Sequence, residues 1–524
     1  MHHARSMTHS AASYQGTSSR TIFSALTHAK LRRDEVQGGQ SATLYYTNYS
    51  GDEEIGCLAF ATMEKRRFSV VRNTQQWSIE EAAAGSNRLP VVHRLSSCSP
   101  LGAARSHGKP SADADVDGDD VFRRDAMRLH SLFREEPTTN KYSPAPPSSP
   151  SSSDALTIPT TGSPLGSLPG TFEYHVAVGF GTPVQVLTVG FDTATQGATL
   201  LQCKPCAAAG DGAVAAPCND VAFDPSASST VSQVPCGSPD CPLSSCSGEG
   251  CTVAVTKDGA VLANATFVMD TFAFSPSAFA LDFRFACLEM GLTMVDHSSG
   301  ILDLSRDRHS LASRAPTSPD TVAFTYCLPP SNNAMGFLSI TAARPELSGR
   351  DVRYATLGSS AAHPTRYVVK LPGIGLAGPD ITIPPAALAG CDSLLDLHTT
   401  FTYLRRDIYA ALRDGFRGRM RGYRAAPPVG ELDTCYDLTG HESYVVPSVT
   451  LRLDGGVNLD LDLDLDQMMY FPDQWSFFSV GCLAFAAAPR GAAVVAVIGT
   501  LVKKSTEVVY DVSGGKVGFI PSSC

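Results

Sequence analysis

The chain has 524 residues, of which 43% are hydrophobic and only 18% charged, and it contains 44 glycines and 35 prolines. This composition favours a β-rich globular protein with many turns and argues against a helical or disordered one. The net charge of −10 argues against a nucleic-acid partner, which requires clustered positive charge.

The N-terminal part shows no pattern of a folded unit. Residues 1–50 lack the run of roughly 7–15 apolar residues that marks a secretion signal. No stretch reaches the ~18 apolar residues of a transmembrane helix, so we expect no transmembrane segment. Residues 1–87 are unassigned, because they match no known unit, and we expect them to be poorly ordered. We also expect that residue 1 is not the natural start of the chain.

Further along, the patterns become regular. Residues 120–133 show a short helical pattern, and the Pro/Ser-rich stretch 136–169 predicts a linker that is too polar to bury a core. Residues 174–178 alternate with period two, which predicts a strand. Residues 407–420 predict a helix. Residues 459–466 alternate Leu and Asp; a cation site is one interpretation, and a strand with one solvated face is the safer one.

Two segments share a pattern that carries chemistry. Asp192 and Asp396, 204 positions apart, each follow an apolar stretch and precede a hydroxyl residue, Thr195 or Thr399, by three positions. Matching places in two halves of a β-rich chain predict a duplicated fold that brings the aspartates together. Two close carboxylates cannot both ionise easily, so one keeps a proton and the other acts as a base on a water. This pair is the machinery of aspartic peptidases.

Other motifs agree with this interpretation, and they occur in a consistent order. They are Gly-Phe-Gly-Thr-Pro at 179–183, Gln-Cys-Lys-Pro-Cys at 202–206, the Phe-Asp-Pro-Ser stretch at 223–230, and the strands at 495–499, 508–511 and 517–519. On these residues the chain resembles the pepsin-like (A1) aspartic peptidases, specifically the plant nepenthesin-like branch. The resemblance covers roughly residues 170–524, and residues 88–135 resemble the prosegment of that branch.

The resemblance implies an all-β, bilobal fold with a central cleft. The N-terminal lobe would span 170–327, with a cysteine-rich insertion at 203–251, and the C-terminal lobe 328–524. It implies a monomer that acts on or binds a peptide or protein, with no cofactor and no metal. It also implies a secreted, cell-wall or vacuolar location, where the sequon at Asn264 is usable for glycosylation.

The cysteines support an oxidising compartment. Seven of the 15 lie between Cys203 and Cys251. The Cys203-x-x-Cys206 pair is half of a zinc or redox motif, but no partner follows at ligand spacing, so we favour disulfides. By resemblance we expect the pairs Cys435–Cys482 and Cys287–Cys524. The odd number leaves at least one free thiol, for which the candidates are Cys391, Cys57 and Cys98.

The catalytic motif departs from the family pattern Asp-Thr/Ser-Gly-Ser/Thr. Thr193 keeps the hydroxyl behind the first aspartate, but Ala194 replaces glycine and adds a methyl group. Leu397 replaces a hydroxyl residue and loses a hydrogen bond between the lobes. His398 replaces the second glycine, where it would displace the water or pair with a carboxylate and break the shared-proton arrangement.

Two further departures surround the same site. Thr256 stands where the flap tyrosine of the family would be, and Lys257 where a glycine would be. Asp303 replaces a glycine behind the first aspartate, where a buried carboxyl needs partners or a proton. We therefore expect an aspartic endopeptidase whose activity is impaired; the alternative is a non-catalytic pseudoprotease that binds a peptide, an inhibitor or a cell-wall partner in its cleft.

Overall fold

The computed structural model describes the greater part of the two predicted lobes and selected segments before them. The described residues are 30–36, 39–45, 88–96, 99, 116–133, 156–159, 172–194, 198–207, 222–248, 250–257, 260–275, 278–290, 298–314, 321–332, 334–340, 347, 349–360, 364–388, 392–455, 459–473, 476–492 and 494–524.

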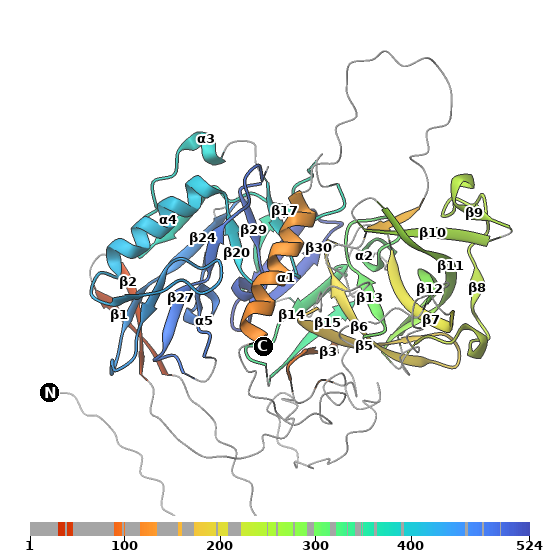
Figure 1. Ribbon diagram of the computed structural model, residues 1–524, viewed down its shortest axis with the longest axis horizontal. Helices are drawn as coiled ribbons and strands as arrows, with labels where there is room; N and C mark the ends of the chain where they lie inside the picture. Colours follow the sequence, from red (N-terminus) through yellow and green to blue (C-terminus); the bar gives the residue numbers. More distant parts are fainter. Residues whose placement is uncertain are drawn as a thin grey trace, which may run out of the picture.

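The molecule has two β-rich lobes, as predicted, with helix α1 (Val116–Phe133) lying between them (Figure 1). The N-terminal lobe is built on a continuous sheet whose order is β5-β6-β13-β7-β12-β11-β10. Its strands are β5 (Tyr174–Phe180), β6 (Gln185–Asp192), β7 (Thr199–Ala207), β10 (Gly250–Lys257), β11 (Ala260–Ser275), β12 (Ala278–Met290) and β13 (Gly300–Asp303).

Short elements complete this lobe and its insertion. They are η3 (Pro225–Ala227), β8 (Ser232–Gln233), η4 (Leu243–Ser245), β9 (Cys246–Ser247) and α2 (Leu311–Arg314). The core is aromatic: the ring of Phe180 is 5.1 Å from that of Phe272 and 5.2 Å from that of Phe285, measured between centroids. The predicted strand at 174–178 is the buried start of β5.

The same sheet continues beneath both lobes in the order β16-β31-β30-β14-β15-β3-β5. Its strands are β3 (Arg88–His93), β14 (Phe324–Cys327), β15 (Met335–Ile340), β16 (Arg353–Thr356), β30 (Glu507–Asp511) and β31 (Lys516–Ile520). Strand β3, from the prosegment-like region, pairs with β15 on one side and β5 on the other. The prosegment-like region is thus an integral part of the sheet that joins the lobes.

The C-terminal lobe is divided among smaller sheets, β17-β19-β29-β20-β28, β18-β24-β25 and β21-β22-β27-β26. The strands of the first sheet are β17 (Val368–Val369), β19 (Ser393–Leu395), β20 (Thr402–Leu404), β28 (Phe485–Ala487) and β29 (Ala496–Ile498). The others are β18 (Gly373–Leu376), β21 (Arg424–Ala426), β22 (Cys435–Asp437), β24 (Val449–Leu453), β25 (Leu459–Asp462), β26 (Met469–Tyr470) and β27 (Val480–Leu483).

The helices of this lobe are α3 (Pro385–Leu388), α4 (Arg406–Arg419), α5 (Leu465–Met468) and η6 (Leu501–Lys503). Helix α4 agrees with the helix predicted at 407–420. The predicted strand over 459–466 is right only for its first half, which forms β25. Asp464 then caps α5, because its side chain and that of Gln467 form a reciprocal capping box that ends the extended conformation.

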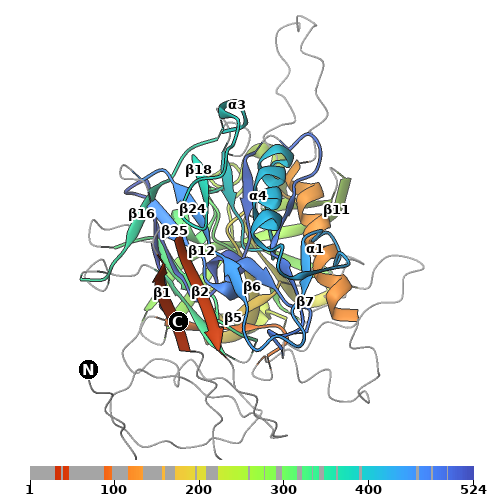
Figure 2. The ribbon, with the colours of Figure 1, turned by 90° about the vertical axis from the view of Figure 1, so that its left-hand side faces the viewer.

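The N-terminal residues also contribute strands. The hairpin β1 (Lys30–Val36) and β2 (Gly39–Tyr45) adds to the edge strand β23 (Val445–Pro447), as Figure 2 shows in red beside the C-terminal lobe. Within the predicted linker, β4 (Thr157–Pro159) pairs in parallel with β10. The remaining residues of 1–87 and of the linker lie outside the described part of the chain.

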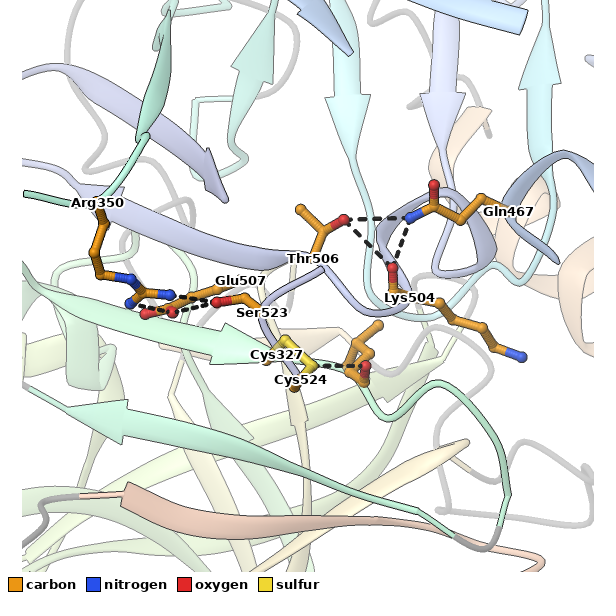
Figure 3. Close-up of a disulfide and its surroundings, with 9 residues drawn as sticks. Cys327, Arg350, Gln467, Lys504, Thr506, Glu507, Ser523 and Cys524 are labelled. Carbon is orange, nitrogen blue, oxygen red and sulfur yellow. Dashed lines mark hydrogen bonds and ion pairs between the residues drawn. A yellow bond between two sulfur atoms is a disulfide. The ribbon is translucent and has the colours of Figure 1, made fainter. Parts of the chain in front are cut away.

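Five disulfides connect the described cysteines: Cys203–Cys287, Cys236–Cys246, Cys241–Cys251, Cys327–Cys524 and Cys435–Cys482. The predicted Cys435–Cys482 pair is confirmed, but the predicted Cys287–Cys524 pair is wrong. Cys287 lies on β12 beside β7, so its neighbour is Cys203. Cys524 instead reaches Cys327 on β14, near an ion pair of Arg350 with Glu507 (Figure 3). The free-thiol candidates Cys57, Cys98 and Cys391 lie outside the described residues.

Within the described residues, we find no helix with the length and apolar character needed to cross a membrane.

The disulfide pattern gives a first prediction. Peptide mapping of the purified protein without reductant should link Cys287 to Cys203 and Cys524 to Cys327, and thiol reagents should leave the ten paired cysteines unlabelled until reductant is added. Labelling of most of these ten cysteines in native extracts would contradict an oxidising compartment.

Candidate active site

The two predicted aspartates lie together at the centre of the molecule. Asp192 ends β6 and Asp396 follows β19, and both side chains are buried. Each carboxylate is held by its own turn. The Ala194 N–H donates to Asp192 Oδ1 at 3.0 Å, and the N–H groups of His398 and Thr399 donate to Asp396 Oδ2 at 3.3 and 2.8 Å. The turn that orients each carboxylate therefore survives the substitutions Ala194 and His398.

The hydroxyl contacts between the two motifs are asymmetric. Thr193 Oγ1 donates across the lobes to the Leu395 carbonyl at 3.4 Å. Leu397, at the matching position, has no hydroxyl and is buried. Thr399 is also fully buried, whereas Thr195 lies outside the described residues. One of the two reciprocal bonds that would lock the lobes is therefore missing.

Behind the aspartates, the two halves of the duplication differ by one carboxyl group. Strand β13 runs parallel to β6 and places Asp303 opposite Asp192, as β29 runs parallel to β19 in the other lobe. Gly499 follows β29, and a side chain there would collide with the Phe401 carbonyl. Asp303 is buried, with Ser305 N–H donating to its Oδ1 at 2.8 Å. Burial raises the pKa of Asp303 well above its usual value, so this carboxyl is neutral.

An arginine from α1 occupies the space between the aspartates. Arg128 Nη2 lies 3.0 Å from Asp192 Oδ2 and 2.6 Å from Asp396 Oδ1, and its Nε donates to Asp396 Oδ1 at 3.1 Å. The guanidinium is 1% exposed. Burial by itself would raise the pKa of Asp396, but Arg128 outweighs it and holds this pKa far below the usual range. Both carboxylates are thus within ion-pair distance of one cation.

Helix α1 presents its apolar stripe to the C-terminal lobe. Val121, Phe122, Leu129 and Leu132 are buried in one cluster with residues of β19, β20 and β29, and the Phe122 ring stacks on Phe401 at 5.1 Å. Arg128 falls on this same stripe, because residues three or four apart on a helix share a face. The apolar contacts therefore position the guanidinium over the dyad.

Two further acidic groups hold α1. Asp125, fully buried, accepts hydrogen bonds from the N–H groups of Thr400 and Phe401 at 2.8 and 3.0 Å and from Tyr403 Oη at 3.0 Å. Burial raises the pKa of Asp125 to about 7 against these hydrogen bonds. The helix is thereby attached to the backbone that directly follows the second aspartic motif.

Beside it, Arg124 pairs with Glu173 at 2.9 Å, with side chains 3% and 10% exposed. Burial would raise the pKa of Glu173, but Arg124, together with the nearby His93, Arg94 and Lys504, outweighs it and lowers the pKa to about 2. This ion pair ties α1 to the chain just before β5, so the helix is anchored to both lobes.

His398 is buried beside the dyad without pairing with it. Its ring packs edge-on against Phe172 at 5.2 Å, and neither ring nitrogen forms a hydrogen bond within the described structure. Burial, together with Arg128, lowers the pKa of His398 to about 4. The imidazole is therefore neutral near pH 7, and the expectation that it pairs with a carboxylate is wrong here. Arg128 is the cation that keeps the carboxylates ionised.

The flap region keeps its hairpin but lacks the aromatic residue. Thr256 lies near the end of β10, half-buried, and pairs in register with Val261 of β11 and Pro159 of β4. The side chain of Lys257 is outside the described residues. Asn264 is exposed on β11.

The sequence interpretation did not identify Arg128, Asp125, Glu173 or Lys503 as site residues. The sequence does contain a signal for Arg128 and Asp125. Both are charged residues on the apolar stripe of a helix, and such residues need partners when they are buried. Which partners they meet is decided 268 and 275 positions further along the chain, where Asp396 and Thr400 lie.

Comparisons with known proteins show the family of the chain. Family models described as xylanase inhibitor N-terminal and C-terminal match residues 174–340 and 366–521. The aspartyl protease AED1 of Arabidopsis thaliana is 29% identical over 85% of this chain and 88% of its own. Aspartic proteinase nepenthesin-2 of Nepenthes gracilis is 26% identical over 68% of this chain and 78% of its own.

A solved structure with a similar fold is that of conglutin gamma, a basic 7S globulin from lupine seeds. It aligns with a TM-score of 0.51 and 17% identity, over 67% of this chain and 92% of its own. The chain belongs to the plant pepsin-like (A1) aspartic peptidase family.

The ion pair at the dyad predicts a pH-dependent loss of stability. Arg128→Met should cost about 3–5 kcal/mol at pH 6, because it leaves buried carboxylates without a counter-ion. The pKa of Asp396 is lowered, so the Arg128 contribution is present above the unfolded pKa, near 4, and declines as the pH falls below it. Thermal unfolding at pH 6 and pH 3 should show the larger loss at pH 6.

The matched control for this experiment is Arg123→Met. Arg123 is an exposed residue on the same helix, and an exposed ion pair contributes at most about 1 kcal/mol, so its substitution should lower the unfolding temperature much less than Arg128→Met does at pH 6. An equal loss for both variants would contradict the assigned ion pair.

Proposed function

We propose that this protein is the latent form of an aspartic endopeptidase, and that its own helix α1 blocks the catalytic pair. The observation that carries the proposal is the Arg128 guanidinium between Asp192 and Asp396, within hydrogen-bond distance of both. A protein with no use for its two carboxylates would have no need to neutralise them with a dedicated residue of the preceding region.

In the proposed mechanism, α1 leaves first and a water takes the place of the guanidinium. The ionised carboxylate of the pair accepts a proton from this water, and the resulting oxygen nucleophile attacks the peptide carbonyl carbon. The protonated carboxyl hydrogen-bonds to the carbonyl oxygen, and a proton is then transferred to the departing amine as the C–N bond breaks. The backbone N–H groups of Ala194, His398 and Thr399 keep the carboxylates oriented throughout.

Acid is the expected trigger for release. The Arg124–Glu173 and Arg128–Asp396 pairs both involve carboxylates with lowered pKa values, so their contribution is lost as the pH falls below about 4. His398 acts in the same direction. Its buried imidazole is neutral, with a pKa of about 4, so the docked form becomes less stable when acid protonates this ring. Asp125 acts in the opposite direction, since its raised pKa favours docking below about pH 7. We propose a secreted or vacuolar protein, in keeping with the five disulfides of the described residues.

The second candidate is a non-catalytic protein that uses the cleft for binding. His398 and Leu397 favour it: the imidazole fills space beside the dyad, and the leucine removes one bond between the lobes. The family-model description, xylanase inhibitor, names a protein class that acts by binding.

An activity assay separates the two candidates. The intact chain should show little or no cleavage of a denatured protein at pH 7. Cleavage should develop after incubation at pH 3–4 with removal of α1, be blocked by pepstatin, and disappear in Asp192→Asn. If acid-treated protein from which α1 has been removed does not cleave, the non-catalytic candidate is favoured.

The altered motif should limit the rate. His398→Gly with Leu397→Ser should raise the activity of the processed protein by at least about tenfold, since it opens space for the water and restores the missing hydroxyl. Ala194→Gly should add a smaller gain, because only a methyl group is removed. Initial rates at acid pH measure both effects, with Asp192→Asn in each background as the blank. Unchanged rates would show that His398 does not obstruct the water.

A further inference from the structure

Lys503 is a buried cation that the proposed mechanism does not use. It is the last residue of η6, which follows β29 and Gly499, and its side chain is 1% exposed. A lysine ammonium is seldom buried unless negative charge or several acceptors surround it, because removing it from water is unfavourable. Its surroundings therefore indicate what it does.

The ammonium is bonded to the backbone of the second catalytic aspartate. Lys503 Nζ donates to the Asp396 carbonyl and, at 3.1 Å, to the Ile498 carbonyl. The Asp396 N–H donates to the same Ile498 carbonyl at 3.1 Å. Lys503 thus closes a small ring of hydrogen bonds that includes both the N–H and the C=O of Asp396, and it fixes the peptide that carries the carboxylate.

The charge of Lys503 also acts on the dyad. Burial lowers the pKa of this ammonium to about 7, against the attraction of Asp396 and Asp192, so it remains charged at acid pH. The other groups facing the pair are the Arg128 cation, the neutral His398, and Arg366.

Arg366 differs from Lys503 in what it is bonded to. It is buried, and its Nη1 donates at 3.5 Å to the carbonyl of Leu132 on α1, whereas Lys503 is bonded to the Asp396 peptide itself. The neutral Asp303 adds no charge behind the dyad.

We propose that Lys503 is a positioning residue and the resident counter-ion of the dyad. With α1 docked, the two carboxylates lie among three buried cations: Arg128, Arg366, and Lys503, which is bonded to the Asp396 carbonyl. When α1 leaves, Arg128 leaves with it and one cation remains bonded to Asp396. The pair then retains one negative charge and takes up one proton, which is the state that general acid–base hydrolysis requires. The catalytic part of this inference rests on the proposed function; the electrostatic part does not.

The test separates the charge of Lys503 from its hydrogen bonds. Lys503→Gln keeps a donor and removes the charge, whereas Lys503→Met removes both. The control is Lys370→Gln, which removes the charge of an exposed lysine elsewhere in the C-terminal lobe.

The first measurement is the unfolding temperature of the full chain at pH 6 and pH 3. Lys503 is protonated over this range both when folded and when unfolded, so a pH-dependent difference reports the carboxylates. The change in unfolding temperature caused by Lys503→Gln should be more unfavourable at pH 6 than at pH 3, since the carboxylates need a counter-ion only while they are ionised. Lys370→Gln should show no such dependence. Equal losses for Lys503→Gln at both pH values would overturn the counter-ion role.

The second measurement is the pH profile of hydrolysis by the processed protein. Without the Lys503 charge, loss of the first proton from the aspartate pair becomes less favourable. The acidic side of the pH–rate profile of Lys503→Gln should therefore shift to higher pH by about one unit. If Lys503→Gln keeps the unaltered pH profile and only Lys503→Met changes it, Lys503 acts as a hydrogen-bond donor alone. That result would overturn the inference. If no variant hydrolyses peptide but the stability pattern holds, the proposed function fails and the counter-ion role stands.

Discussion

The structure depends on the neutralisation of two buried carboxylates that share one small space. Removing either carboxylate from water is unfavourable by several kcal/mol, and placing two side by side adds repulsion. The Arg128 guanidinium relieves both effects at once, because its planar fork presents N–H groups to two acceptors. Since Arg128 belongs to α1, the ionisation of the two aspartates and the docking of this helix are coupled.

The attachment of α1 is distributed over both lobes. Its apolar stripe packs on β19, β20 and β29, Asp125 bonds to the backbone beyond the second motif, and Arg124 pairs with Glu173 next to β5. Strand β3, from the same region, lies inside the sheet beneath the lobes. A segment held in this way leaves only when several buried ionic contacts weaken together, which makes proton concentration an effective control.

The duplicated halves have become electrostatically unequal. The first half carries Asp303 behind its aspartate, and this extra carboxyl is kept neutral by burial. The second half keeps Gly499 at that place but has His398 and Lys503 around its aspartate. Of these two groups only the Lys503 ammonium is charged, and a positive charge bonded to the Asp396 carbonyl favours the ionised form of Asp396. Among the five disulfides of the described residues, one joins the C-terminal residue to β14 (Figure 3).

The local features of this protein were determined by its sequence. The period-two strand at 174–178, the helix at 407–420, and the two apolar segments ending in Asp192 and Asp396 arise from short-range patterns, and with the ordered motifs they predicted a bilobal fold. Long-range contacts were decided by the tertiary structure. Cys287 pairs with Cys203 rather than Cys524 because β12 lies beside β7. Arg128 contacts Asp396 because helix α1 packs against a part of the fold that lies 268 residues further along the chain. The ionisation of His398, Asp303 and Lys503 follows from burial, which depends on the residues that the fold places around each group and not on those beside it in the chain.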